Sequence, residues 1–276
     1  HIVDAWPADQ THQLATVKLT GEPRRLFLNG NRVVVYTRMT TTDGKTGAGS
    51  SNPSDQGCTY GYGCRFSSEG GHTMATIFDV TDPSQPQELM RYQMSGGYVA
   101  SRRIGSTVYT VVSDTGAPQI AGVDYQITAN SYDELLAAVA QKKAANDALI
   151  EGADDAYFLP WLRRVTPDGQ TTVDASCNHA LATVGALGTS FVSLLAFDLT
   201  KLEPMTRTVL GSNPGYVYAS SSALYLAVDQ TPEIDYGSAS YVGTRATNTA
   251  VHKFALSGTD TRYVASVALT GHILNQ

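Results

Sequence analysis

Cysteine and histidine offer the most reactive side chains in this chain, and one short segment brings them together. Cys177 and His179 are two residues apart, so on an extended segment both point to the same side. A thiolate and an imidazole are two of the ligands that zinc takes, but a tetrahedral site needs a second close pair. The sequence contains no such pair, and we therefore expect no metal site there.

The other two cysteines of the chain favour a structural disulfide. Cys58 and Cys64 enclose five residues, two of them glycine, in a Gly/Ser-rich stretch. This pattern is typical of a small surface disulfide and hence of an oxidising compartment; free thiols and a metal-bound pair are the alternatives. Cys177 is left over, so it is either buried or paired with a cysteine outside this sequence.

Two groups of carboxylates supply oxygen atoms, which are the ligands that Ca²⁺ prefers. Asp43 and Asp55 lie in one loop, and Glu151, Asp154 and Asp155 follow a predicted helix. Neither group has the spacing of an EF-hand or of a glycine-rich calcium repeat. We expect a solvated acidic surface and no cofactor, and we keep a calcium-dependent adhesin as a third hypothesis of function.

Linear catalytic signatures are absent from the sequence. It contains no Gly-x-Ser-x-Gly elbow, no His-Glu-x-x-His, no phosphate-binding loop and no Gly-x-Gly-x-x-Gly after a strand. The segment 166–171 reads as a plain turn at Asp168-Gly169. His252 lies beside apolar residues of a strand, which favours a packed histidine over a catalytic base.

Three aspartates recur at one position of a repeated pattern, immediately after a strand and before a turn with proline. They are Asp4, Asp79 and Asp198. A carboxylate there accepts hydrogen bonds from backbone amides two residues on, which fixes the turn. We assign all three to structure rather than to catalysis.

The repeated pattern itself consists of a strand, a second strand that ends in glycine, and a hairpin. The first strands lie at 2–6, 77–81, 196–200 and 253–257, and the glycines are Gly21, Gly96, Gly211 and Gly271. The hairpins turn at Asn29-Gly30, Gly105-Ser106 and Ser221-Ser222. The Asn29-Gly30 pair predicts a two-residue primed turn with positive φ at both central positions.

Repetition of four-stranded units is typical of a β-propeller. We predict an all-β fold of four-stranded antiparallel blades, about three and a half of them, in one partial propeller domain over residues 1–276. With strands named a to d from the axis outward, the first unit has only c and d, at 1–6 and 13–20. The complete blades occupy 24–95, 98–210 and 215–270. We interpret the sequence as part of a longer protein with further blades.

Each complete blade carries its excess length between strands b and c, at residues 39–73, 114–189 and 230–247. In an antiparallel blade this loop leaves on the same face as the linker to the next blade. We therefore expect all three insertions on one face, as a working surface or as a cap over the ends of the ring.

The middle insertion predicts the one helix of the chain, around 131–151. Ser131 and Glu134 form a capping-box signature, an apolar stripe follows, and Gly152 suits the end of the helix. Tyr157, Phe158 and Trp161 follow in a dense apolar patch. This patch either packs the helix onto the propeller or forms an exposed partner surface.

Composition narrows the class of partner. The net charge of −6 at pH 7 argues against general attraction to nucleic acid or anionic membranes. No apolar run approaches the roughly 20 residues that a transmembrane helix requires.

The segments 2–7 with 21–28, 218–227, and 249–254 with 271–276 resemble a family of secreted bacterial and archaeal proteins. That family carries a C-terminal β-propeller domain distantly related to WD repeats. The resemblance implies a secreted or cell-surface location and further blades, and it supplies no catalytic residues.

These observations favour a binding or surface-assembly module that uses the face with the long b–c loops, with a protein or glycan as partner. The alternative is a hydrolase or lyase whose active site lies in the central channel and draws residues from several blades. Because the first unit lacks strands a and b, we also expect its open edge to recruit a second copy or a completing fragment.

Overall fold

A computed structural model of the chain describes residues 1–39, 71–114, 120–154, 158–175, 177–182, 190–230, 248–271 and 273. The strands are β1 (Ile2–Asp4), β2 (His12–Ala15), β3 (Glu22–Asn29), β4 (Arg32–Met39), β5 (His72–Asp79), β6 (Gln87–Ser95), β7 (Gly97–Ile104), β8 (Thr107–Asp114), β9 (Leu162–Val165), β10 (Thr171–Asp174), β11 (Ala180–Ala182), β12 (Phe191–Asp198), β13 (Thr206–Gly211), β14 (Tyr216–Ala219), β15 (Ala223–Gln230), β16 (Asn248–Ser257) and β17 (Asp260–Thr270). The helices are α1 (Tyr132–Glu151) and the short 3₁₀ turns η1 (Ala8–Gln10) and η4 (Cys177–His179). Within these ranges no helix has the length and apolar character needed to cross a bilayer.

The strands form three antiparallel four-stranded meanders in the predicted order, preceded by one two-stranded sheet. β3-β4-β5-β6 are strands a to d of blade one, β7-β8-β12-β13 those of blade two, and β14-β15-β16-β17 those of blade three. β1 and β2 form a separate two-stranded sheet, the half-blade, and are shorter than the predicted 1–6 and 13–20. The predicted propeller fold with one helical insertion is confirmed, and the sheets do not close into a ring.

Apolar side chains on both faces of the strands hold the blades together. In β12, Leu195 and Phe197 are buried against blade one, whereas Leu194 and Ala196 are buried against blade three. This alternation follows from the pleat, which sends successive side chains to opposite faces. Each large side chain buried in this way contributes roughly 1.5–3 kcal/mol.

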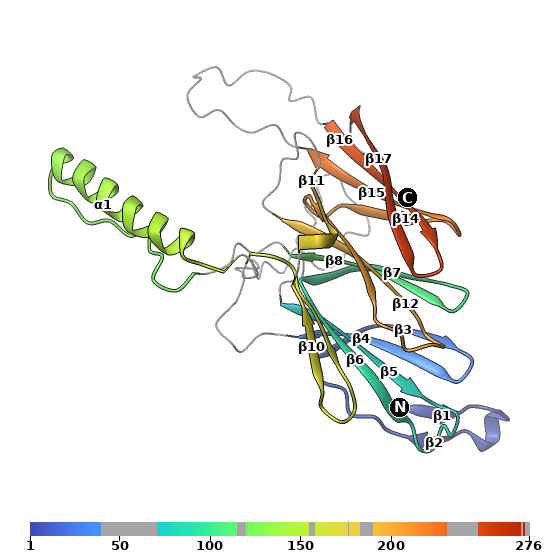
Figure 1. Cartoon of the computed structure of the whole chain (residues 1–276). Coiled ribbons are helices and arrows are strands. Elements are labelled where there is room, and N and C mark those ends of the chain that lie inside the picture. The colour runs from blue at the N-terminus through green and yellow to red at the C-terminus, as the bar shows by residue number, and fades with distance from the viewer. Residues whose placement is uncertain are drawn as a thin grey trace.

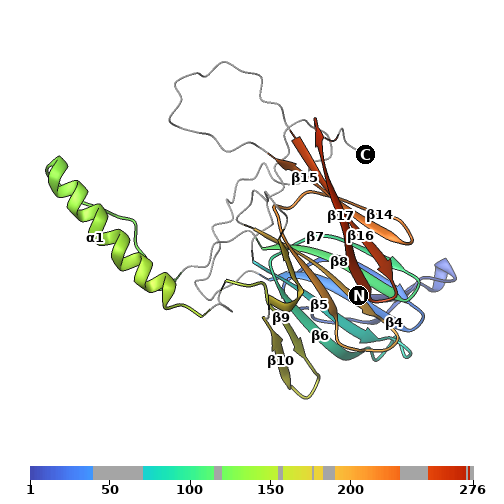
Figure 2. The same cartoon turned by 45° about the horizontal axis from the view of Figure 1, so that its top comes forward.

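Equivalent strands of neighbouring blades lie against one another. Between the b strands, the Tyr36 and Thr110 hydroxyls are 2.5 Å apart, and between the d strands, the Thr208 and Thr261 hydroxyls are 2.9 Å apart. Burial raises the pKa of the Tyr36 phenol. The sheets therefore stack in the same orientation, as Figures 1 and 2 show.

The first hairpin turns one residue later than predicted. Asn29 pairs with Arg32, so the loop consists of Gly30 and Asn31, and only Gly30 has positive φ, at 58°. Gly105 and Gly258 take the same first position in the β7–β8 and β16–β17 hairpins, with φ of 61° and 55°. Glycine at the first central position is the signature of a type II′ turn.

The link from strand d to the next strand a needs glycine because two backbones approach closely there. At Gly21, φ is 84°, and a Cβ would lie 2.3 Å from the Arg38 carbonyl oxygen. At Gly96, φ is 89°, and a Cβ would lie 2.5 Å from the Ser113 carbonyl oxygen. Gly211 ends β13, but the close approach before blade three is made by Gly215, whose Cβ would lie 2.0 Å from the Ala227 oxygen.

Candidate binding surfaces

The three insertions start and end on one side of the stack. The last residue of each strand b pairs with the first of strand c: Met39 with His72, Asp114 with Phe191, and Gln230 with Asn248. Because the sheets share one orientation, these positions define a common side, which we call the insertion face. The hairpin turns lie at the other side, where Arg103 Nη1 donates to Asn29 Oδ1 at 3.3 Å.

The second insertion adds strands to two blades. β9 pairs antiparallel with β6, from Leu162 opposite Met94 to Val165 opposite Arg91, and β10 continues the sheet. β11 pairs in parallel with β13. The sheets of blades one and two therefore have six and five strands instead of the predicted four. These additions cover the outer edges of β6 and β13, which would otherwise present unpaired backbone groups.

Trp161 fastens this insertion to blade one. Its amide donates to Ser95 Oγ at 2.9 Å, and the Ser95 amide donates to its carbonyl oxygen at 3.0 Å. Its ring lies 4.8 Å from the His72 ring, and the Arg163 guanidinium lies 5.2 Å from the ring centroid. Phe158 is half-buried, and Tyr157 lies outside the described residues.

The structure places Trp161 and Leu162 of this patch on blade one, and packing of α1 onto the propeller through the rest of the patch stays a prediction. Trp161 and Leu162 contact blade one, whereas α1 projects away from the sheets in both views (Figures 1 and 2). The patch continues directly into β9, and the pairing of β9 with β6 holds Trp161 and Leu162 at blade one.

Arg207 joins the insertion to blade two. Its side chain, in β13, is only 2% exposed; Nη1 donates to the Pro160 carbonyl oxygen at 2.7 Å, and Nη2 lies 3.1 Å from Asp174 Oδ1. Burial lowers the pKa of Arg207, and the Asp174 carboxylate opposes that shift. The sequence marks Arg207 only as an arginine inside an outer strand, which does not indicate its contacts with the insertion.

The predicted helix has the predicted ends. Ser131 Oγ accepts from the Glu134 amide at 3.2 Å, and Glu134 Oε2 accepts from the Asn130 amide at 2.9 Å. This is a capping box with its reciprocal bond moved by one residue. The Gly152 amide donates to the Ala148 carbonyl at 3.1 Å and ends the helix.

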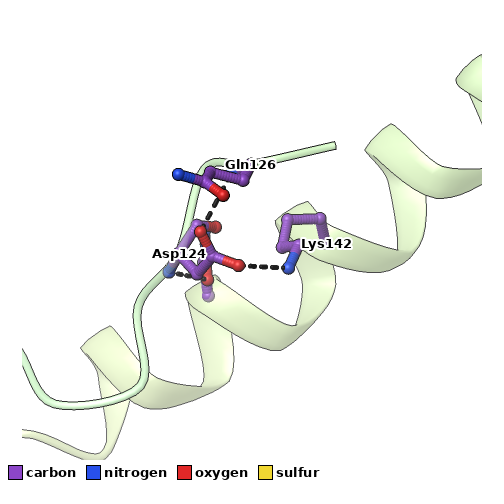
Figure 3. Close-up of polar contacts among 4 residues, drawn as sticks. Asp124, Gln126 and Lys142 are labelled. Atoms are coloured by element: carbon purple, nitrogen blue, oxygen red, sulfur yellow. Dashed lines mark hydrogen bonds and ion pairs between the residues drawn. The ribbon is translucent and has the colours of Figure 1, made fainter. Parts of the chain in front are cut away.

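The segment 120–130 runs back along α1 and is tied to it by polar contacts. Lys142 Nζ lies 2.8 Å from Asp124 Oδ2, and the Gln126 amide donates to Asp124 Oδ1 at 2.9 Å (Figure 3). The side-chain Nδ2 of the buried Asn146 donates to the Asp124 carbonyl oxygen at 2.9 Å. The hydrogen bond from Lys142 is the main reason why the pKa of Asp124 is lowered. These contacts hold the segment 120–130 against α1.

Apolar side chains remain exposed along α1. Leu135, Leu136 and Val139 are 40%, 52% and 43% exposed on its first half, and Ile150 is 41% exposed near its end. Exposed aliphatic side chains on a projecting element make this surface a candidate for interaction. We call Leu135, Leu136 and Val139 the helix patch.

The repeated aspartates lie at the turns between strands c and d. Asp4, Asp79 and Asp198 each accept from the amide two residues on, at 3.2, 2.8 and 2.8 Å. Hydrogen bonds from the Thr81 hydroxyl and amide lower the pKa of Asp79. At Asp198, burial raises the pKa, but hydrogen bonds from Thr200 and Ser106 outweigh it and lower the pKa. These turns are far from the insertion face and shape the scaffold.

The other chemically suggestive residues do not converge in the part of the chain that the structure describes. No group of three or more His, Cys, Asp and Glu side chains is placed there to hold a metal ion. His252 is buried beside the Ser266 hydroxyl, and burial lowers its pKa. Cys58 and Cys64 lie outside the described residues, so the disulfide stays a prediction, as does the pairing of Cys177.

Comparison with known proteins agrees with this architecture. The family model of the β-propeller domain matches residues 1–276, so the chain belongs to the β-propeller domain family. No curated protein and no solved structure matches the chain.

Proposed function

We propose that the protein is a secreted β-propeller that binds a partner, or takes part in a surface assembly, through its insertion face. The helix patch carries this proposal. It places exposed aliphatic side chains on an element that projects from a rigid stack of blades. Loops and insertions on a rigid scaffold are where binding residues gather.

The chemistry of the helix patch favours a protein over a glycan as partner. Leucine and valine provide no ring for a sugar to stack on, whereas an apolar helix face fits a hydrophobic groove on another protein. The neighbouring lysines are already paired, Lys142 with Asp124 and Lys143 with Asp147. Apolar contact, rather than charge, would therefore provide most of the affinity.

The test compares the protein with a triple variant, Leu135→Glu, Leu136→Glu and Val139→Glu, in binding to intact cells and extracellular material of the source organism. The matched control carries Ala137→Glu, Ala144→Glu and Ala148→Glu, which add the same charge at exposed positions on the opposite side of α1. We expect the helix variant to bind at least roughly tenfold more weakly than the control. Circular dichroism checks that α1 remains folded.

Equal binding by the two variants would remove the helix patch from the proposal. Secretion is tested separately, by fractionation of the source cells. Mass spectrometry of the unreduced protein then determines whether Cys58 and Cys64 form the disulfide expected of an oxidising compartment.

A further inference from the structure

The first half of α1 has a charge pattern that is complementary to itself. Asp133 and Glu134 lie in the first turn of the helix, and seven uncharged residues follow them. Lys142 and Lys143 come next. The two lysines lie as far after Ala138 as the two acids lie before it. Two copies of this segment, placed antiparallel and centred on Ala138, would therefore set each acid opposite a lysine of the other copy.

One side of the helix contains an acid and a lysine of this pattern together with the apolar residues between them. Positions that are spaced by three and four residues lie on one side of a helix, and here they are Asp133, Leu136, Ala140 and Lys143. We call these four residues the α1 stripe. All four are exposed, Leu136 at 52% and the Lys143 side chain at 74%.

The cover that the chain itself supplies lies on another side of α1. The segment 120–130 holds the helix through Lys142 and Asn146, which lie about 100° or more around the helix from the centre of the α1 stripe. In the part of the chain that the structure describes, no ion pair involves the Asp133 carboxylate. Lys143 Nζ lies 2.5 Å from Asp147 Oδ2, and its exposure leaves it open to a second carboxylate.

We propose that α1 pairs antiparallel with α1 of a second copy of this chain along the α1 stripe, about a twofold axis beside residue 138. Leu136 of each copy then packs against Ala140 of the other, and a large side chain opposite a small one lets the two helices pack closely. Asp133 of each copy meets Lys143 of the other, which fixes orientation and register. This inference rests on the proposed function, because it names a second copy as the protein that α1 binds.

The position of α1 leaves room for this pairing. The segment 120–130 runs back along α1, so the start of the helix is the tip of the projection and its end lies nearer the sheets (Figures 1 and 2). Pairing about residue 138 sets residue 132 of one copy beside residue 144 of the other, seven residues before α1 ends. At about 1.5 Å per residue, roughly 10 Å of helix remain between that tip and the end of α1.

The test measures self-association of the full chain by sedimentation equilibrium at concentrations up to about 1 mM. A contact between two single helices is a small interface, below about 1,200 Å², so we expect a weak dimer that depends on concentration. Leu136→Glu should raise the dissociation constant at least roughly tenfold. Ala145→Glu is the matched control, because it adds the same charge at an exposed position on the opposite side of the helix, and it should leave the dissociation constant unchanged.

Exchange of charges tests the antiparallel register. Asp133→Lys alone and Lys143→Glu alone should each weaken the dimer, since each variant sets like charges opposite one another. An equal mixture of the two variants should associate again, because one copy then supplies both lysines and the other both acids. Hydrogen exchange of the α1 amides shows whether each variant remains helical.

Three results would overturn the proposal: a chain that stays monomeric over this range, a dimer that Leu136→Glu leaves intact, or a mixture of the charge variants that does not associate. A monomeric chain whose binding to cells still depends on the helix patch would reject the second copy as the partner and retain the proposed function. The two proposals can therefore fail separately.

Discussion

Gly96 shows how a single residue fixes the join between two blades. It links β6 to β7 with φ of 89°, and a Cβ at this position would lie 2.5 Å from the Ser113 carbonyl oxygen. Gly105 also has positive φ, at 61°, but a Cβ there would meet no atom within 4 Å. An alanine at Gly105 would therefore be destabilised by the backbone conformation alone, whereas an alanine at Gly96 would be destabilised by the conformation and by a steric clash.

Gly96→Ala is predicted to lower the free energy of unfolding by roughly 2–4 kcal/mol, because strain and overlap with the backbone add. Gly105→Ala should cost only about 1 kcal/mol, the penalty of the left-handed conformation alone. Chemical denaturation of both variants measures the difference. Equal losses would show that the close approach at Gly96 is not tight.

Protonation of the Asp79 carboxylate should make the stability of the protein depend on pH. Hydrogen bonds from Thr81 lower its pKa in the folded state, with a further contribution from Arg32 at 3.7 Å. A lowered folded pKa means that the stabilisation is complete above the unfolded value of about 3.9 and is lost as the pH falls through the folded value.

The variant Asp79→Asn should therefore be less stable than the native protein at pH 7, and the two should converge toward pH 2. The amide oxygen still accepts a hydrogen bond but has no charge to lose. Denaturation across this pH range measures the gap between the two proteins. A gap that stays constant would contradict the assigned role of the carboxylate.

Among the elements, those with a local signal were predictable and those defined by distant pairing were not. The recurring pattern of strand c and the glycine at the end of each strand d mark the repeat, so the order of strands a to d followed from the sequence. β9 and β10 are four-residue strands with few apolar side chains, and β9 pairs with a strand some seventy positions earlier, such as Val165 with Arg91. Nothing near residue 165 identifies that partner.

The helix was predictable in its bounds but not in its surroundings. Ser131 and Glu134 define the start of α1 through contacts with their immediate neighbours. An apolar stripe, by contrast, indicates that a surface has a partner and does not identify the partner. The segment 120–130 supplies part of that cover through Asp124, while the helix patch stays exposed. The sequence thus indicated the apolar stripe of α1, but it identified Tyr157, Phe158 and Trp161, rather than Leu135, Leu136 and Val139, as the possible partner surface.

Arg207→Met is predicted to loosen the second insertion while leaving the blades folded. The change removes the contacts with Pro160 and Asp174 but keeps an apolar side chain in the buried position. We expect a loss of about 1–2 kcal/mol. Hydrogen exchange should become faster in β9 and β10, and β12 and β15 should keep their protection.

The control for this experiment is Arg102→Met, at an exposed position of β7. It should change neither the melting temperature nor the exchange of β9. If Arg207→Met left β9 fully protected, the pairing with β6 alone would hold the insertion, and the ion pair with Asp174 would be dispensable.

At the scale of the whole molecule, the stack buries its inner faces and leaves its two end faces apolar. At one end Leu26 borders an apolar groove that Ile2, Val33 and Phe78 also line. At the other end Val267 and Leu269 are each 51% exposed on β17. Apolar faces beside open strand edges are the places where further strands pair in β-proteins. The geometry of a propeller blade thus accounts both for the closely packed interior of the stack and for the apolar side chains exposed at its two ends.

The common orientation of the sheets underlies the insertion face and the function proposed for it. It is tested most directly by replacing Thr208 and Thr261, whose hydroxyls are 2.9 Å apart, with cysteine in a chain whose Cys58, Cys64 and Cys177 are serine. Mild oxidation should join the two strands d in a disulfide, because the two sulfur atoms would take the places of hydroxyl oxygens that lie 2.9 Å apart. Peptide mapping by mass spectrometry would detect the bond. Thiols that stay reduced in the folded protein would contradict face-to-face stacking of equivalent strands.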